Sequence, residues 1–237
     1  NGAERKRWTQ TSWTQDDPNA ALIQNPRVTE SKVGDAANTK RTTVDYYLQP
    51  GTTVAADGLV KEVKVYAADQ TSVWKKIYTE YNLAAAYAAR RIVGLPSMTE
   101  AWGWNQETNQ LEKVSKITYG YDEEDFTLET NQNISTVIRH DTANFGAGFI
   151  VGRGNLTSVT RHDATGATAA VTTKTRYDLA GSVVAKLDAL NRKTRIEYAD
   201  SFNDGINSRN TFAYPTKLFD AGDNFSEVKY RFDTGAN

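Results

Sequence analysis

The 237-residue sequence contains no cysteine. This absence excludes disulfide bonds, thiolate nucleophiles and cysteine-ligated zinc sites, and it is compatible with both cytosolic and secreted proteins. Only two histidines and one methionine are present. No stretch approaches the roughly 18 consecutive apolar residues that a membrane-spanning helix requires. The sequence therefore lacks the signals of a membrane span and of cysteine-based chemistry.

A strong excess of one charge is also absent, because 28 basic residues nearly balance 29 acidic residues. A formal charge of −1 gives no electrostatic reason to expect nucleic acid or an anionic membrane as a partner. With 39% hydrophobic and 11% aromatic residues, the chain is not expected to be disordered. Its length is sufficient for one large all-β domain or two small domains.

The two ends of the sequence indicate a fragment of a longer polypeptide. The chain opens with "NGAERKRW", which lacks an initiating methionine, and it ends with "RFDTGAN", which looks like the start of another repeat unit. No signal peptide is recognisable, but in a fragment this gives no evidence against secretion.

An internal repeat is visible in the last third of the chain. A shift of 32 residues places Leu187-Asp188 on Phe219-Asp220 and Tyr198 on Tyr230, after an insert that contains "SFNDGINSRNTFAYPT". Upstream, "HDATG" has the same Asp-x-x-Gly spacing as Asp178 and Gly181. The repeat is clear after about residue 150 and degenerate before it. We therefore divide the chain into a degenerate region, 1–150, and a region of clearer repeats, 151–237, within one continuous sheet.

Each repeat unit is predicted to be a hairpin of two short strands. In 226–233, "SEVKYRFD", apolar and charged residues alternate with the period of a strand that has one solvated face. The segment 193–198 shows the same alternation. The Asp-x-x-Gly and Asp-x-x-Asn sequences supply turns, because aspartate bonds to nearby backbone amides while glycine and asparagine tolerate positive φ. The hairpins are expected to join into one antiparallel sheet.

The remaining elements are predicted from weaker patterns. One helical insert is expected at 83–92, with Asn82 as its N-cap and Gly94 and Pro96 beyond its end; a loop with helical turns is the alternative. The segments 99–110 and 203–210 resemble exposed loops. Further strands are expected at 42–48, 59–66, 73–81, 114–121, 156–161 and 171–177.

The pattern Tyr-Asp-x-x-Gly-x-Val, followed by Asp-x-x-Asn-x-x-Thr-x-x-x-Tyr, resembles the Rhs or YD repeat of bacterial Rhs proteins, Tc-toxin C components and teneurins. The best match spans Tyr177 to Tyr198, with partial matches at 154–166 and 219–235. Histidine and phenylalanine replace tyrosine at positions 162 and 232, and Asn191 stands where glycine is usual. The repeat residues are Tyr177, Asp178, Gly181, Asp188, Asn191, Thr194, Tyr198, Asp220, Tyr230, Phe232 and Asp233.

This resemblance implies a mainly β fold in which antiparallel hairpins form part of a spiralling shell. In such proteins the shell encloses or carries a toxic polypeptide. The expected partners are neighbouring repeats of the same polypeptide and an enclosed C-terminal toxin, and the expected location is secreted or at the cell surface. The self-cleaving aspartyl protease of some relatives has no counterpart here, since the only "DP", at Asp17-Pro18, lacks the expected surroundings.

Catalytic interpretations of the repeat residues are weak. Adjacent strand residues point to opposite faces, so Tyr177 and Asp178 are not expected to act on one substrate atom. We expect the tyrosine to pack and the aspartate to cap the turn. His140 and His162 each follow arginine and precede aspartate, which raises the alternative of a metal site. Each histidine also occupies a tyrosine position of the repeat, which is the simpler explanation.

Two further stretches suggest binding. The glycine-rich "GAGFIVGRG" at 146–154 lacks the spacing and the following helix of a dinucleotide fingerprint, so a bulge or a close backbone approach is expected. Trp102 and Trp104 would share a face if extended, as a glycan-stacking platform requires, although packing is the more common role of such aromatics. A glycan-binding surface adhesin is therefore the alternative to a structural shell segment. We expect no enzymatic activity and no cofactor.

Overall fold

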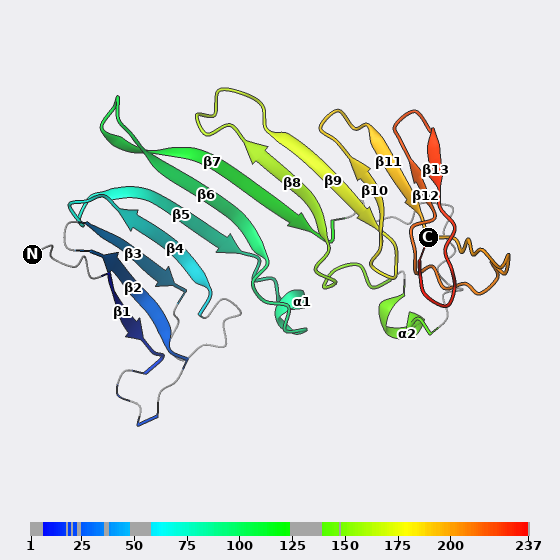
Figure 1. The fold of residues 1–237 in the computed structure, drawn as a ribbon, viewed down its shortest axis with the longest axis horizontal. Helices are drawn as coiled ribbons and strands as arrows, with labels where there is room; N and C mark the ends of the chain where they lie inside the picture. The colour runs from blue at the N-terminus through cyan, green and yellow to red at the C-terminus, as the bar shows by residue number, and fades with distance from the viewer. Residues whose placement is uncertain are drawn as a thin grey trace, which may run out of the picture. The chain divides into compact units, whose positions relative to one another are not determined.

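The computed structural model describes residues 7–17, 19, 21–22, 25–35, 38–47, 58–123, 139–146 and 148–236. These residues form thirteen strands and two four-residue helices (Figure 1). The strands follow chain order in a single antiparallel sheet, each hydrogen-bonded to the next. The prediction of a mainly β, antiparallel hairpin fold is therefore confirmed.

Contacts within the chain separate it into two compact units. Unit 1 comprises residues 1–118 and 161–170, and unit 2 comprises residues 119–160 and 171–237. The first seven strands are β1 (Trp8–Thr14), β2 (Arg27–Gly34), β3 (Thr39–Tyr46), β4 (Val60–Tyr66), β5 (Val73–Tyr81), β6 (Pro96–Asn105) and β7 (Gln110–Tyr121). The others are β8 (Leu156–His162), β9 (Val171–Tyr177), β10 (Val183–Leu187), β11 (Lys193–Glu197), β12 (Lys217–Phe219) and β13 (Phe225–Glu227).

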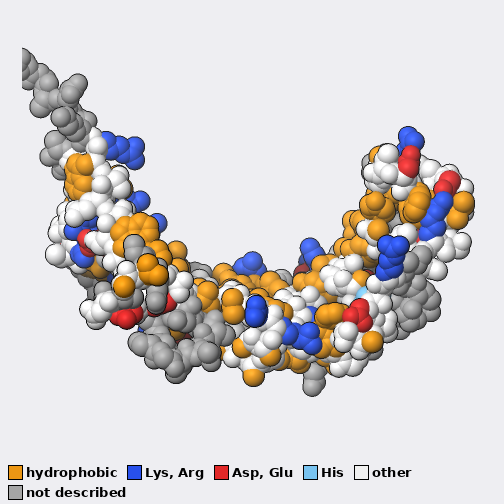
Figure 2. Space-filling view, turned by 90° about the horizontal axis from the view of Figure 1, so that it is seen from below, with side chains coloured by type: hydrophobic (Ala, Val, Ile, Leu, Met, Phe, Trp, Pro, Cys, Tyr) orange, Lys and Arg blue, Asp and Glu red, His pale blue; other side chains and the backbone are white. Residues whose placement is uncertain are grey.

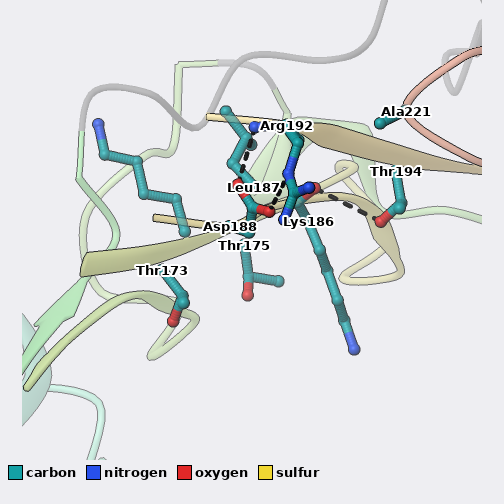
Figure 3. A pocket seen from close by; sticks show the side chains of 9 residues that line it. Thr173, Thr175, Lys186, Leu187, Asp188, Arg192, Thr194 and Ala221 are labelled. Atoms are coloured by element: carbon teal, nitrogen blue, oxygen red, sulfur yellow. Dashed lines mark hydrogen bonds and ion pairs between the residues drawn. The ribbon is translucent and has the colours of Figure 1, made fainter. Parts of the chain in front are cut away.

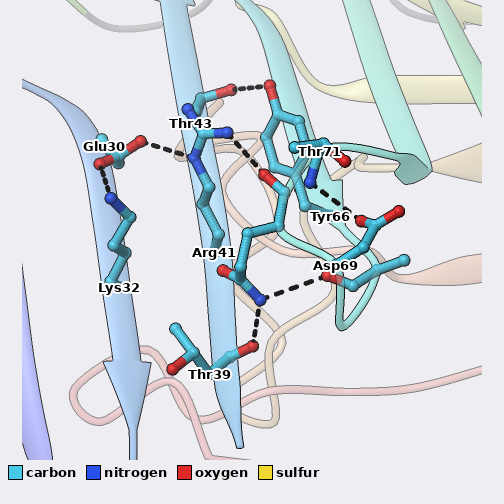
Figure 4. A network of polar contacts seen from close by, with 10 residues as sticks. Glu30, Lys32, Thr39, Arg41, Thr43, Tyr66, Asp69 and Thr71 are labelled. Atoms are coloured by element: carbon cyan, nitrogen blue, oxygen red, sulfur yellow. Dashed lines mark hydrogen bonds and ion pairs between the residues drawn. The ribbon is translucent and has the colours of Figure 1, made fainter.

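In unit 1, a network of charged and polar side chains links β2, β3 and β4 (Figure 4). The carboxylate of Glu30 accepts hydrogen bonds from Lys32 at 2.8 Å and from Arg41 at 2.6 Å. The Arg41 guanidinium also lies 4.4 Å from the ring centroid of Tyr66. The hydrogen bonds from Lys32 and Arg41 lower the pKa of Glu30. The contacts of Arg41 with Glu30 and with Tyr66 join neighbouring strands. They favour one register, because a slip of one residue would move each partner to the other face.

Hydrophobic burial is sparse for a chain of this length. Among the described residues, the buried hydrophobic side chains are Tyr87, Val184, Ala185 and Phe202. Figure 2 shows hydrophobic side chains at the surface beside charged ones, and Trp13, for example, is 61% exposed. A sheet that packs against a second layer would bury most of one face. Strand pairing, cross-strand contacts and turns therefore have a large share in holding this fold together.

The predicted helix at 83–92 is shorter than expected. Helix α1 spans only Ala85–Ala88, and turns follow it to residue 91. Asn82 does not occupy the N-cap position, which is Ala84, but its Oδ1 accepts a hydrogen bond from the Ala84 amide at 3.1 Å. Arg91 has a φ of 58°, which ends the helical path. A short helix is marginal unless one face is buried, and only Tyr87 is buried here.

A second helix was not predicted. Helix α2 spans Thr142–Phe145 in the connection between β7 and β8. Asp141 is its N-cap, and the Asp141 side chain accepts a hydrogen bond from the amide of Asn144 at 3.1 Å. This arrangement is a normal helix start. The expectation of a single helical insert was therefore wrong.

The strand predictions are accurate for 73–81 and 171–177 and within one residue at either end for 59–66, 156–161 and 193–198. Strand β7 begins at residue 110, four residues before the predicted start at 114, and β3 begins at residue 39. The position of residue 48, the predicted end of that strand, lies outside the described residues. The loop expected at 99–110 was wrong, because β6 continues to Asn105 and only 106–109 form a turn. Strands β1 and β2 were not predicted.

Candidate functional site

The Tyr-Asp pair of the repeat lies at the turn between β9 and β10. The Asp178 amide donates to the carbonyl of Ser182 at 2.9 Å, and the Gly181 amide donates to the carbonyl of Asp178 at 3.0 Å. The Asp178 Oδ1 accepts from the Ser182 amide at 2.8 Å. Gly181 has a φ of 87°, a conformation that is costly for most other residues. Aspartate and glycine thus form one hydrogen-bonded tight turn.

The same turn geometry recurs three times in the chain. In each case the first residue is an aspartate whose carbonyl accepts from the amide three residues later, and that later residue has positive φ. The side chain of the aspartate also accepts hydrogen bonds from amides within the turn. The residues at the third following position are Gly166, Asn191 and Asp223, after Asp163, Asp188 and Asp220 respectively.

The carboxylates of these three turn aspartates are more acidic than usual. Backbone hydrogen bonds from Thr165, together with the hydroxyl of Thr165, lower the pKa of Asp163 to about 2. The backbone hydrogen bond from Arg192 lowers the pKa of Asp188, and the side chain of Asn224 lowers that of Asp220. Hydrogen bonds that stabilise a carboxylate always act in this direction. The turns therefore hold these carboxylates in the charged form.

Asp178 differs from the other turn aspartates because it is buried. Its side chain is 1% exposed, and its Oδ2 has no hydrogen-bond partner among the described residues. Burial raises its pKa, although backbone hydrogen bonds from Ser182, Ala180 and Gly181 act in the opposite direction. Desolvation of the charged form is the physical cause. The Tyr-Asp pair of the repeat thus places its carboxylate inside the fold.

The repeat tyrosines anchor neighbouring strands. The hydroxyl of Tyr198, one residue beyond β11, donates to the carbonyl of Val183 at the start of β10 at 3.1 Å. Tyr230 donates to the carbonyl of Pro215 at 2.9 Å. Both the donors and the acceptors are 32 residues apart, so the sequence repeat is also a repeat of this hydrogen bond.

Three further tyrosines make the same type of contact, and two of them, Tyr46 and Tyr81, lie outside the region of clearer repeats. Each of them ends the second strand of a hairpin and donates to a carbonyl at or near the start of the first strand. We call this contact the tyrosine anchor. The further anchors are Tyr46 to Val28 at 2.9 Å, Tyr81 to Val60 at 2.9 Å and Tyr177 to Leu156 at 3.0 Å. The degenerate part of the sequence therefore contains the same hairpin device as the clear part.

The anchor was missed by the sequence analysis, which expected these tyrosines to act through packing. Burial raises the pKa of Tyr81, Tyr177 and Tyr198, as it does for phenols that are partly removed from water. The available signal was the constant position of tyrosine at the end of a strand. A phenol hydroxyl needs a partner when its ring packs against a sheet, and the nearest strand end supplies one.

The end of the glycine-rich stretch 146–154 binds a carboxylate of the chain itself. Asp122 is 4% exposed, and its Oδ2 accepts from the amides of Gly152, Arg153 and Gly154 at 2.9 to 3.1 Å. Its Oδ1 accepts from the Asn155 amide at 2.9 Å. Successive amides that converge in this way form an anion-binding nest. The close backbone approach expected here is thus made to Asp122, a residue that sequence reasoning did not single out.

The predicted strand 226–233 was wrong beyond its first residues. Strand β13 ends at Glu227, and the chain then turns toward the insert that precedes β12. The Tyr230 amide donates to the carbonyl of Ser201, and the ring of Phe232 meets that of Phe202 edge-on, with centroids 5.3 Å apart. Asp233 is exposed, next to Arg231 at 3.4 Å. The insert offers residues 228–233 both a backbone hydrogen-bond partner and an aromatic contact. These contacts replace the continuation of β13 as a regular strand.

Trp102 and Trp104 lie on β6 with alternate positions on one face, as the sequence suggested. The Trp102 ring is contacted by the ammonium groups of Lys76 and Lys113, at 4.7 Å and 5.3 Å from its centroid. Cations at these distances interact favourably with an indole face. The ring of Trp102 is therefore already engaged by cations of the neighbouring strands, which weakens the case for a glycan platform there.

The two histidines have separate local partners. The Nε2 of His162 lies 3.0 Å from the hydroxyl of Thr118. His140 lies 3.2 Å from the hydroxyl of Thr142 through Nδ1 and 3.3 Å from the carbonyl of Leu179 through Nε2. Within the part of the chain that the structure describes, no group of three or more His, Cys, Asp or Glu residues could hold a metal ion. No helix of the described residues is long and apolar enough to span a membrane.

Comparisons with known proteins give only a weak structural similarity. No family model and no curated protein matches the chain. The crystal structure of TcdB2-TccC3-Cdc42 matches at 14% identity with a TM-score of 0.31, over 96% of this chain and 15% of that chain. The structure of TcdB2-TccC3 without its hypervariable C-terminal region matches at 13% identity with a TM-score of 0.28, over 94% and 14% of the two chains. The chain spans about 15% of the length of the chains it matches.

Proposed function

We propose that the chain is a structural segment of an Rhs/YD-repeat shell that encloses or carries a toxin or effector of the same polypeptide. On this proposal its partners are the neighbouring repeats and the enclosed polypeptide, and the complete protein is secreted or displayed at the cell surface. The segment needs no cofactor and performs no catalysis of its own.

The recurrence of one hairpin device carries this proposal. Strands are joined by hydrogen-bonded aspartate turns, and the tyrosine anchor ties the end to the beginning of the hairpins β8–β9, β10–β11 and β12–β13. Tyr198 and Tyr230 show the device at a spacing of 32 residues, with acceptors at the same spacing. A device that repeats along the chain allows a sheet to grow by addition of identical units, because each unit contacts only its neighbours.

The sparse burial of hydrophobic side chains also favours a wall over an independent globular domain. Only Tyr87, Val184, Ala185 and Phe202 are buried hydrophobics among the described residues. A sheet of this kind leaves apolar side chains accessible on its surface, such as Ile77, which is 46% exposed. Such surfaces usually contact another layer or another polypeptide.

The ionisable residues of the motif support a structural role. Asp178, Asp188 and Asp220 use their carboxylates to bind backbone amides of their own turns. The hydroxyls of Tyr177 and Tyr198 are engaged by carbonyls. A general acid or base must instead reach a proton of a substrate. These side chains are committed to the fold.

Protease protection in the complete polypeptide tests this proposal. Limited proteolysis of the intact protein should leave a polypeptide of non-repeat sequence protected for as long as the sheet remains folded. Tyr198→Ala should expose that polypeptide at a lower denaturant concentration, whereas Tyr119→Phe should not. A non-repeat region that is cleaved immediately in the folded protein would contradict the shell. Glycan binding that is lost in Trp102→Ala would favour the adhesin alternative instead.

A further inference from the structure

A groove whose lining residues are mainly threonine, lysine and other polar types lies on one face of unit 2, near the turn between β10 and β11. Its volume is about 570 Å³, within the range of small-molecule sites. Lys186 on β10 pairs in register with Thr175 on β9 and with Thr194 on β11. Figure 3 shows Thr175 and Thr194 on either side of Lys186. Three neighbouring strands therefore present two hydroxyls and one ammonium group in a row.

The cation of this row is not neutralised by the chain. No carboxylate of the described residues forms an ion pair with Lys186, which is exposed. The hydroxyls of Thr173 and Thr175 make no hydrogen bond to another described residue, and that of Thr194 makes only a long contact of 3.4 Å with the Lys186 carbonyl. Hydroxyls can donate and accept, whereas the ammonium group only donates. The groove thus offers unused hydrogen-bonding capacity with a positive charge at its centre.

The single carboxylate that lines the groove does not cancel this charge. Asp188 accepts hydrogen bonds from the amides of Leu190 and Arg192, each at 2.9 Å. Its Oδ2 also accepts from the Nε of Arg192 at 2.6 Å. Because Asp188 and Arg192 neutralise each other, the charge of Lys186 remains.

We propose that this groove binds a small polyhydroxylated anion, such as a uronic acid or another carboxylated sugar. The carboxylate of the ligand would pair with the ammonium group of Lys186, a charge-assisted hydrogen bond that is stronger than a neutral one. The ligand hydroxyls would exchange hydrogen bonds with Thr173, Thr175 and Thr194. A neutral sugar lacks the first contact and a simple carboxylate such as acetate lacks the second. This site is independent of the shell function.

NMR titration of the 237-residue chain tests the proposal with glucuronate, glucose and acetate as probes. Glucuronate should shift the amide signals of Thr175, Lys186 and Thr194, and it should bind more tightly than either glucose or acetate. Lys186→Gln should weaken glucuronate binding roughly tenfold, as expected for loss of a charged partner. The same variant should leave glucose binding unchanged. Thr194→Val should weaken both sugars.

Lys229→Gln is the matched control, because Lys229 is an exposed lysine of the same unit outside the groove. It should bind glucuronate as the unchanged chain does. Amide signals away from the groove report whether each variant is folded. Absence of shifts at roughly 20 mM glucuronate, which would still reveal a millimolar Kd, would overturn the proposal. It would also be overturned by acetate binding as tightly as glucuronate, or by equal losses in Lys186→Gln and Lys229→Gln.

Discussion

The hydroxyl of Tyr198 donates a hydrogen bond to the backbone carbonyl of Val183 at a distance of 3.1 Å. This bond joins the end of one hairpin to its beginning, across fifteen residues of sequence. The equivalent bond from Tyr230 to Pro215 spans the same number of residues in the next hairpin. The stability of the repeat should therefore depend on a specific hydroxyl as well as on the packing of a ring.

Substitution of Tyr198 should separate these two contributions. Tyr198→Phe should lower the free energy of unfolding by about 1 kcal/mol, because one hydrogen bond to a partly buried carbonyl is lost. Tyr198→Ala should cost more, about 2–3 kcal/mol, which is below the range for fully buried aromatics because the ring is half-buried. Urea denaturation measures both values.

Tyr119→Phe is the control for the loss of a hydroxyl, since that hydroxyl makes no hydrogen bond within the described part of the chain. It should leave the urea midpoint unchanged. Equal destabilisation by Tyr198→Phe and Tyr119→Phe would show that the anchor contributes nothing. Equal destabilisation by Tyr198→Phe and Tyr198→Ala would show that the ring contributes nothing.

Glycine at position 181 should be required for its backbone conformation and not for space. Gly181→Ala should destabilise the chain by about 1 kcal/mol, because alanine is strained at a φ of 87°. A Cβ atom at this position would meet no heavy atom within 4 Å. Gly148 has equally open surroundings without a positive φ, so Gly148→Ala should be neutral or slightly stabilising. Thermal unfolding of the two variants compares them, and equal Tm values would rule out the conformational explanation.

Asp122 should be the residue on which the connection between β7 and β8 depends. Asp122→Asn should lower the free energy of unfolding by about 2–4 kcal/mol, because an amide group cannot accept from all four backbone N–H groups. Hydrogen exchange at Gly152 and Gly154 should accelerate. Asp141→Asn is the matched control in the same connection, since asparagine is an equally good helix N-cap. Unchanged exchange in Asp122→Asn would refute the role of the carboxylate.

The two classes of turn aspartate should titrate in opposite directions from the usual value. The Asp163 carboxyl should titrate at about pH 2, because the amide and hydroxyl of Thr165 stabilise its charged form. Asp178 should titrate above the ordinary value of 3.8, because it is buried. Carbon-13 NMR of the side-chain carboxyls measures both directly. Titration of both groups near 3.8 would contradict this assignment.

The consequences for stability have opposite signs. The pKa of Asp163 is lower in the folded state, so its contribution is present at neutral pH and is lost as the pH falls toward 2. The pKa of Asp178 is higher in the folded state, so its contribution is full at low pH and is lost as the pH rises through the folded pKa. Asp178→Asn should therefore abolish the part of the free energy of unfolding that is larger at low pH than at neutral pH. Urea denaturation at two pH values would reveal this change.

The sequence by itself determined the hairpin architecture. Period-two alternation specified the strands at 73–81 and 171–177, because opposite faces of a strand meet different surroundings. Asp178 with Gly181, and Asp188 with Asn191, specified turns, since their side chains and allowed φ values are local properties. Such features depend on residues that are close in sequence, and they were predictable for that reason.

The tertiary structure alone decided the partners of these residues. Nothing local to Tyr198 indicates that its hydroxyl meets the carbonyl of Val183, because that distance depends on how two strands pair. The four amides that bind the Asp122 carboxylate likewise lie 30 to 33 residues further along the chain. Their approach to Asp122, at the end of β7, is therefore not a local property. The end of β13 at Glu227 was decided by competition with the insert around Phe202, whose aromatic and backbone contacts outweigh a local strand preference that spans only about 1 kcal/mol.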